Sequence, residues 1–266
     1  MSTPMLNIAL KAARAACTIM NRASDNLASL EVHKKAHHDY VSEVDMACER
    51  TIIDILREAY PNHQILAEET GITGPEKSAY QWIIDPLDGT TNFLHGFPQY
   101  AVSIALKREN EVIEAVVADP VANEVFTATR GVGAFVNGRR LRVSKRTQMA
   151  EALVGTGFPF RRTDDYDAFL KVFKEVAQST SGLRRAGAAS LDLAYVAAGR
   201  LDAFWEANLK SWDMAAGSLL VLEAGGLVTD FKGENDYLEK GQIIAGTPKI
   251  FGQLLPMVQK NYGDIK

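Results

Sequence analysis

The chain has 266 residues, of which 47% are hydrophobic and 23% are charged, a composition typical of globular proteins. Its formal net charge is −4, and this lack of a basic excess argues against a general nucleic-acid-binding protein. No stretch approaches the roughly 20 consecutive apolar residues that a membrane span requires. The first residues, MSTPMLNIALKAARAAC, predict an amphipathic helix instead of a secretory signal. We therefore expect a cytoplasmic protein with no membrane partner.

The chain contains two cysteines, Cys17 and Cys48, and both fall in segments predicted to be helical. Their spacing matches neither a metal-binding pair nor a framework of disulfide bonds. Free cysteines inside helices are commonly buried and behave as small apolar side chains. We expect two unreactive core thiols in a protein of a reducing compartment.

The N-terminal part is predicted to form two helices. The first begins at Pro4, and its apolar stripe comprises Leu6, Ile8, Leu10, Ala13 and Cys17. The second covers residues 44–59 and ends before Pro61, and its predicted core-facing side chains are Met46, Ile52, Ile53 and Leu56.

The remaining elements mix strands and helices, with no linker that divides the chain. Strands are predicted at 64–67, 81–84, 101–106, 112–118 and 124–128, and a hairpin at 135–136 and 140–143 turns at Asn137-Gly138. After residue 150 we predict strands at 153–156, 202–206, 227–229 and 242–245, and helices at 164–178, 190–198, 214–224 and 249–259. This order predicts one layered α/β domain over residues 1–266, with helices and sheets alternating as in a sandwich.

The densest group of functional residue types is WIIDPLDGTTNF at 82–93. Pro86 places Asp85 in an extended conformation at a strand end, and Asp88 follows on a turn. Two carboxylates held so close repel each other unless a divalent cation with oxygen ligands lies between them. Gly89, Thr90 and Thr91 then offer successive amides and two hydroxyls to a phosphate group. A polar turn that merely connects two elements is the alternative, although the full string is more specific than an Asp-Gly pair.

Three further acidic residues are candidates for the same site. Glu68, in AEETG, follows the strand at 64–67, although adjacent glutamates also occur in solvated loops. Asp45 begins the second helix, where a capping role explains it as well as a metal-binding role. Asp213 begins a helix of small apolar residues and is either an N-terminal cap or a metal ligand aimed by close packing against a sheet.

Two cationic segments are weaker candidates. His33, Lys34-Lys35 and His37-His38 predict a polar loop near Asp39, which either binds a metal or is simply exposed. Arg184-Arg185 and the small residues 186–189 either bind an anion or form surface ion pairs. The chain contains no nucleophile elbow, P-loop or dinucleotide-binding motif, which argues against serine-hydrolase and nucleotide-binding folds.

Taken together, these residues resemble the inositol monophosphatase family, within the fructose-1,6-bisphosphatase superfamily of lithium-sensitive, metal-dependent phosphatases. The resemblance extends from Pro4 to the last helix, and its two signatures are the string at 82–93 and WDMAAGSLLVLEAGG at 212–226. AEETG, TGFPF at 156–160 and the segment 183–206 are similar to the bacterial SuhB-type members. The resemblance implies an αβαβα layered sandwich, commonly homodimeric, that hydrolyses myo-inositol monophosphate and similar polyol phosphates with magnesium.

The resemblance also implies roles for individual residues. The site would hold two to three Mg²⁺ ions. Glu68, Asp85 and the Leu87 carbonyl would bind the first, and Asp85, Asp88 and Asp213 would bind the second. Glu68 and waters would bind a weaker third ion. Gly89, Thr90 and Thr91 would bind phosphate next to Leu87, Asp88 and Asp213. Thr90 and Glu68 would orient the attacking water with help from Asp45. The residues facing the polyol would be Arg184, Gly187, Ala188, Ala189 and Glu206, and Lys34 or Lys35 would approach the site.

Two alternatives to this activity stay open. The SuhB-type resemblance implies a regulatory role, with transcription antitermination factors and RNA polymerase as partners and the phosphatase site retained. A fructose bisphosphatase or nucleotide phosphatase of the same superfamily would differ only in substrate. For a phosphatase of this kind, the chemistry favours direct displacement by water, without a phosphoenzyme.

Overall fold

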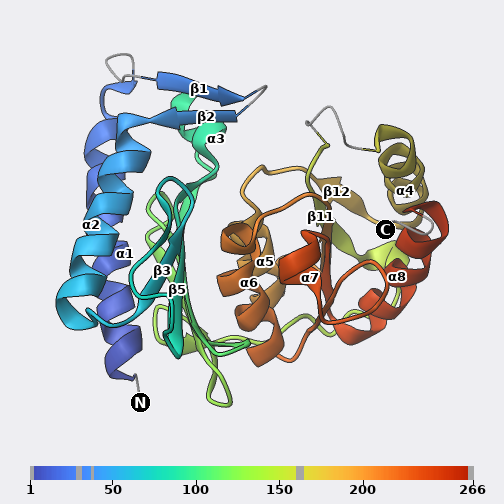
Figure 1. Ribbon diagram of the computed structural model, residues 1–266. Helices are drawn as coiled ribbons and strands as arrows, with labels where there is room; N and C mark the ends of the chain where they lie inside the picture. The colour runs from blue at the N-terminus through green and yellow to red at the C-terminus, as the bar shows by residue number, and fades with distance from the viewer. Residues whose placement is uncertain (1–2, 28–31, 37–38, 160–164, 263–266) are drawn as a thin grey trace.

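The computed structural model describes residues 3–27, 32–36, 39–159 and 165–262 (Figure 1). Helices and sheets alternate in layers across this part of the chain, as Figure 1 shows from left to right. The helical layers are α1 (Pro4–Ser24) with α2 (Glu43–Ala59), then α5 (Ala189–Ala197) with α6 (Ser211–Glu223), then α4 (Tyr166–Ser179) with α8 (Pro248–Tyr262). An eight-stranded and a five-stranded sheet separate them. This is the αβαβα sandwich that the resemblance implies.

The larger sheet has the strand order β10-β9-β8-β7-β6-β5-β3-β4. Its strands are β3 (Gln64–Ala67), β4 (Gly71–Thr73), β5 (Tyr80–Asp88), β6 (Ala101–Arg108), β7 (Glu111–Asp119), β8 (Glu124–Thr129), β9 (Gly133–Val136) and β10 (Arg139–Arg140). All neighbours are antiparallel except β3 and β5, which run parallel and therefore end at the same edge. The predicted hairpin at Asn137-Gly138 is confirmed. Its second strand is shorter than predicted, because the chain leaves the sheet after β10 and runs to the end of α6, where Val143 N donates to Ala224 O.

The smaller sheet has the strand order β12-β11-β13-β15-β14. Its strands are β11 (Leu153–Thr156), β12 (Gly182–Arg184), β13 (Ala203–Glu206), β14 (Leu227–Thr229) and β15 (Ile243–Gly246). Strand β11 is parallel to both β12 and the central β13, whereas β15 is antiparallel to β13 and β14. The short β4 and β12 were not predicted, because Gly-Ile-Thr and Gly-Leu-Arg each begin with glycine and contain one apolar residue, too little pattern to mark a strand.

The middle layer is buried on both sides, since α5 and α6 lie between the two sheets. Both helices consist largely of small apolar residues, which allow them to approach each other closely. A Cβ atom added to Gly217 on α6 would lie 2.5 Å from Leu193 Cβ on α5. The close packing predicted for the helix at 214–224 is thus confirmed. The helix packs closely against α5 as well as against the sheets.

The outer pair α1 and α2 packs on the other face of the larger sheet, but its predicted apolar faces were partly wrong. The buried residues of α1 are Leu6, Ala9, Ala12, Ala13, Ala16 and Met20. Alanines allow close packing against α2, so the bulkier Ile8, Leu10 and Cys17 lie half-buried at the margin of the core. On α2, Met46 faces solvent with 43% of its surface exposed, whereas Ile52, Ile53 and Leu56 are buried as predicted.

Residues predicted to form a cationic loop instead form a hairpin of β1 (Val32–Ala36) and β2 (Asp39–Ser42). The two strands are antiparallel, with His33 opposite Val41 and Lys34 opposite Tyr40. Backbone pairing satisfies peptide groups whatever the side chains are, so the polar composition did not exclude strands. His37 and His38 lie outside the described residues, as do the side chains of Lys34 and Lys35.

Both cysteines are free thiols, Cys48 buried and Cys17 half-buried. Burial raises the pKa of Cys17 to about 12, and burial also raises that of Cys48. Each thiol is therefore protonated at neutral pH and a poor nucleophile. Within the described ranges, no helix combines the length and apolar character needed to cross a bilayer.

Candidate active site

The predicted acidic residues come together at the ends of β3 and β5 and the start of α6. Glu68 directly follows β3, and its amide donates to Ile84 O of the parallel β5 at 3.2 Å. Asp85 and Asp88 belong to β5, and Asp213 lies in the first turn of α6. All four line a cleft of about 490 Å³ with Leu87, Gly89, Thr90, Thr91, Asn92, Phe158, Pro159, Tyr166, Arg185 and Gly187. This volume suits a small ligand.

The strand β5 runs further than the predicted 81–84 and is irregular where the carboxylates stand. Asp85 pairs with Ser103 and Asp88 with Ala101 of β6, so two residues of β5 lie between these pairs where β6 has one. Pro86 has no N–H to donate, which favours such an interruption of the ladder. The Leu87 amide instead donates to Asp85 Oδ1 at 3.0 Å. The interruption brings both carboxylates to the cleft.

The electrostatics of this cluster are unfavourable without a counter-charge. Asp85 is 2% exposed, and its pKa is raised well above the usual range by burial and by the charges of Glu68, Asp88 and Asp213. Burial also raises the pKa of Asp88 to about 6. Among the described residues, no three His, Cys, Asp or Glu side chains already form a complete metal-ligand geometry. The donor set nevertheless fits magnesium, because a hard cation takes carboxylate and carbonyl oxygens and would relieve this repulsion.

Two of these carboxylates are oriented by backbone amides. Asp88 Oδ2 accepts hydrogen bonds from Ser190 N at 2.8 Å and Ser190 Oγ at 2.5 Å, at the start of α5. The partial positive charge at a helix N-terminus favours an anion there. Asp213 Oδ2 accepts from Lys210 N at 2.6 Å. Each contact fixes the orientation of one carboxylate at the cleft.

Asp45 caps α2, one of the two interpretations that the sequence left open, and also contacts the cleft residue Thr90. It completes a capping box at the start of α2, because the Ser42 amide donates to Asp45 Oδ2 at 2.9 Å. Its other oxygen, Oδ1, accepts from Thr90 Oγ1 at 2.9 Å, the contact that the family resemblance implies. The Thr90 hydroxyl also lies 3.1 Å from the Leu87 carbonyl oxygen, so its single proton is given to one acceptor at a time.

The glycine after Asp88 begins the short helix α3 (Thr90–Leu94). Gly89 has φ 94°, a left-handed conformation that glycine adopts without strain. The first amides of a helix have no acceptor inside it, so those of Thr90 and Thr91 are suited to phosphate oxygens. Asn92 Nδ2 donates to Gln99 O at 2.7 Å and to Ala186 O at 2.9 Å, which ties α3 to the segment before α5.

The residues expected to face the polyol lie in different places. Gly187 lines the cleft, whereas Ala188 and Ala189 are buried at the start of α5, where the Ala189 amide hydrogen-bonds Asp88. Arg184 is exposed on β12, outside the lining of the cleft, and donates to Leu183 O at 2.9 Å. The neighbouring Arg185 lines the cleft in its place, because successive residues of a strand end point in opposite directions.

Glu206 lies at the end of β13 and lines a separate small cavity with Asp165 and Tyr262. Its carboxylate occupies the space where a Cβ atom on Gly157 would stand. The pKa of Glu206 is raised well above its usual range by burial and by the charge of Asp192, while Arg185 opposes the shift. Glu206 is therefore electrostatically coupled to the cleft through Arg185, although it does not line it.

Sequence analysis missed several residues that support the site. Glu49 is 1% exposed and accepts hydrogen bonds from Glu69 N at 2.8 Å and Thr70 N at 3.0 Å, which holds the turn carrying Glu68. Its position one helical turn after Asp45 is the only local signal for this role. Phe158 and Tyr166 form an aromatic wall of the cleft, with the Arg185 guanidinium 5.4 Å from the Phe158 ring centre.

Comparison with known proteins gives the same result as the geometry. The model of the inositol monophosphatase family matches residues 1–262 of this chain. The chain belongs to the inositol monophosphatase family. The phosphatase character of this family agrees with a cleft lined by four carboxylates and by the first amides of α3.

Individual members of the inositol monophosphatase family match over almost their whole length. The chain is 58% identical over 260 residues to the Nus factor SuhB of Pseudomonas aeruginosa, covering 96% of each sequence. Among solved structures, the extragenic suppressor protein suhB of Bartonella henselae matches with a TM-score of 0.94 and 44% identity, over 97% of this chain and 99% of that one. An inositol monophosphatase from Anabaena matches with a TM-score of 0.82 and 35% identity, over 96% and 95%.

Proposed function

We propose that this protein is a magnesium-dependent phosphomonoesterase that hydrolyses myo-inositol monophosphate and similar small polyol phosphates to the alcohol and phosphate. The observation that carries the proposal is the convergence of Glu68, Asp85, Asp88 and Asp213 on the cleft that holds the first amides of α3. Carboxylates alone would repel a phosphate ester. Together with bound cations they form a site that attracts one.

The metal ligands in this proposal are Glu68, Asp85, Asp88, Asp213 and the Leu87 carbonyl, holding two to three Mg²⁺ ions. Bound magnesium supplies charge neutralisation for the phosphoryl group and lowers the pKa of the attacking water. Gly89, Thr90 and Thr91 bind phosphate oxygens.

Water activation is assigned to Glu68 and Thr90. The Thr90 hydroxyl donates to Asp45, so its oxygen can accept a hydrogen bond from the attacking water. Glu68 accepts the second hydrogen bond, orients the water in line with the leaving alcohol and takes one proton as the new P–O bond forms. The old P–O bond breaks, and the leaving alkoxide takes a proton from solvent. The alcohol is bound by Arg185 and Gly187, which line the cleft. Glu206 acts on this end of the cleft through its electrostatic coupling to Arg185. Ala188, Ala189 and Arg184 lie outside the lining. Positioning and charge neutralisation are what phosphoryl transfer requires, so no covalent enzyme intermediate is needed.

Phosphate release is expected to require added magnesium and to be inhibited by calcium and by lithium. Calcium prefers more ligands and a looser geometry than magnesium, so it occupies an all-oxygen site unproductively. The test is phosphate release from myo-inositol monophosphate after exhaustive chelation and stepwise return of Mg²⁺. Glycerol phosphates, fructose bisphosphate and adenosine 3′,5′-bisphosphate in the same panel define the substrate. Full activity in the chelated protein would contradict the metal mechanism.

A second candidate function is regulatory binding, favoured by the relative that is 58% identical and named a Nus factor. We propose that the chain, as a cytoplasmic homodimer, also binds transcription antitermination factors and RNA polymerase. A protein partner needs an interface of about 800 Å² per side, more than the cleft offers. The partner surface is therefore distinct from the metal cluster.

Asp213→Asn is expected to lose phosphate release and to keep partner binding, because the substitution removes a metal ligand inside the cleft and leaves the outer surface unchanged. Arg184→Glu, on the exposed end of β12, serves as the complementary variant, expected to weaken partner or subunit contacts. Both properties are measured on the same purified proteins, as phosphate-release rate and as pull-down yield. Loss of both by folded Asp213→Asn would show that metal loading controls binding.

A further inference from the structure

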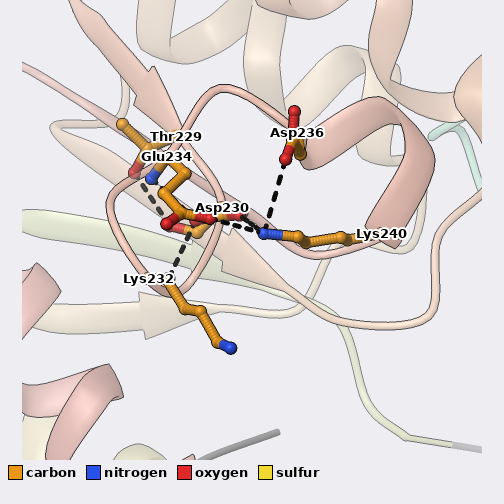
Figure 2. A network of polar contacts seen from close by, with 6 residues as sticks. All are labelled: Thr229, Asp230, Lys232, Glu234, Asp236 and Lys240. Carbon is orange, nitrogen blue, oxygen red and sulfur yellow. Dashed lines mark hydrogen bonds and ion pairs between the residues drawn. The ribbon is translucent and has the colours of Figure 1, made fainter. Parts of the chain in front are cut away.

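Lys240, the last residue of the short helix α7 (Tyr237–Lys240), lies among three carboxylates far from the cleft residues in sequence (Figure 2). Its Nζ atom is 2.5 Å from Asp230 Oδ2, 2.8 Å from Glu234 Oε2 and 3.7 Å from Asp236 Oδ2. Figure 2 shows the ammonium group where these side chains meet. It thus places a positive charge at the centre of these three carboxylates.

The loop is built around the carboxylate of Asp230, which is completely buried. Asp230 Oδ1 accepts hydrogen bonds from Lys232 N and Glu234 N, each at 2.8 Å. The Asp230 amide donates in turn to the Glu234 carbonyl at 2.9 Å. A buried charge that loses its partner is strongly destabilising, so the loop depends on Lys240 for its closed form.

Helix α7 has four residues, too few to be stable without tertiary contacts. It ends at Gly241 in the left-handed conformation, with φ 68°. The Gly241 carbonyl accepts a hydrogen bond from Leu209 N at 3.0 Å. A Cβ atom on Gly241 would lie only 2.5 Å from Leu209 O, so the two backbones are in direct contact.

Leu209 leads directly into the candidate active site. The next amide, that of Lys210, donates to Asp213 Oδ2 at 2.6 Å and so orients this carboxylate. Tyr237 of α7 also interacts with Ser218 of α6, the helix that carries Asp213. A continuous path of contacts therefore leads from the Lys240 ammonium through Gly241 and the 209–210 segment to a carboxylate of the cleft.

We propose that Lys240 is a positioning residue that holds the 209–210 segment in place and thereby sets the affinity of the cleft for its divalent cation. The inference rests on the proposed function in one respect, that Asp213 is a metal ligand. When the ammonium is absent, the Asp230 loop opens, α7 loses its anchor and the Leu209 amide loses its acceptor. The Lys210 amide then no longer fixes Asp213, and the cation binds to a carboxylate that must first be ordered.

The test compares Lys240→Met, which keeps length and removes charge, with Lys240→Arg, which keeps the charge. Lys260→Met is the matched control, because Lys260 forms an exposed ion pair with Glu175 between the outermost helices. Mn²⁺ binding by electron paramagnetic resonance gives metal affinity without turnover. Half-saturating Mg²⁺ and kcat are measured in parallel, with hydrogen exchange at the Leu209 and Lys210 amides.

For Lys240→Met we expect metal affinity to fall about ten-fold or more, the usual effect of losing a group that orients a ligand. The kcat of Lys240→Met at saturating Mg²⁺ stays within about two-fold of wild type, because the Asp213 carboxylate is disordered but still present and can bind once Mg²⁺ is in excess. The Leu209 and Lys210 amides exchange their hydrogens faster, because their hydrogen bonds are lost more often. Lys240→Arg and Lys260→Met keep the wild-type affinity. A lower melting temperature of Lys240→Met with unchanged Mn²⁺ affinity would overturn the inference and leave a purely structural role.

If Lys240→Met does not fold, Lys240→Gln decides, because it removes the charge while its neutral amide can still donate a hydrogen bond to Asp230. A weaker Mn²⁺ affinity in Lys240→Gln supports the inference, and the wild-type affinity overturns it. Failure of the proposed function and failure of the inference about Lys240 give different results. Wild-type protein that neither binds Mn²⁺ nor needs Mg²⁺ contradicts the proposed function itself, whereas metal-dependent wild-type protein with unchanged variants contradicts only the role of Lys240.

Discussion

Asp88→Asn is expected to lower phosphate release by more than about a hundred-fold, because it removes a negative charge and an oxygen ligand at the centre of the metal cluster. The two side chains are nearly equal in size, so the change tests charge and ligation instead of packing. The Asn carbonyl can still accept the hydrogen bond from Ser190 N that Asp88 accepts at 2.8 Å. The backbone around the cleft therefore stays in place. The measurement is kcat over a series of Mg²⁺ concentrations.

The same substitution is expected to leave stability unchanged or higher in metal-free protein. Burial raises the pKa of Asp88 to about 6, which means that the folded state disfavours its charged form at neutral pH. Asparagine removes this cost. Asp54→Asn, on the exposed side of α2, is the matched control and should change neither rate nor melting temperature. Near-native turnover of Asp88→Asn at saturating Mg²⁺ would show that Asp88 is only a turn residue.

Gly89→Ala is expected to reduce both stability and activity, because this position combines a left-handed backbone with close backbone neighbours. Its φ is 94°, and an added Cβ would lie 2.8 Å from Gln99 O and 3.3 Å from Tyr100 Cα. Left-handed strain costs about 1–2 kcal/mol and overpacking about 1–3 kcal/mol, so a loss of about 2–5 kcal/mol is expected in urea unfolding. The resulting shift of α3 also moves the Thr90 hydroxyl away from Asp45, so turnover falls.

Gly131→Ala is a control that separates the cost of the left-handed backbone from the cost of the steric clash of the added Cβ. Gly131 has φ 77°, also left-handed, but no heavy atom lies within 4 Å of an added Cβ. This control should lose only about 1 kcal/mol, the strain alone, and should keep full activity. Equal losses in the two variants would mean that α3 moves freely away from Gln99, and that its contact there does not hold the phosphate-binding amides.

Much of the architecture followed from local sequence patterns. The regions of the longer helices and strands were predicted within a few residues, because periodicity, proline and glycine act on neighbouring positions. The string at 82–93 likewise predicted two carboxylates close together at the end of a strand, as the structure has at Asp85 and Asp88. The short β4 and β12 and the polar hairpin of β1 and β2 were missed because backbone pairing, and not a periodic side-chain pattern, creates them.

Only the tertiary structure decided which carboxylates meet and what holds them. Ser190 is 102 positions from Asp88, and Glu49 is 20 positions from Glu69, so no local pattern connects these partners. The choice of Arg185 over Arg184 for the cleft depends on the direction in which β12 ends, which its neighbour β11 sets. Lys240 is the clearest case, since its route to Asp213 passes through Gly241 and Leu209, joined by one backbone hydrogen bond. Local sequence determines the conformation of each segment. Which charged side chains are buried, and how the metal-binding carboxylates are oriented, depends on which segments pack together.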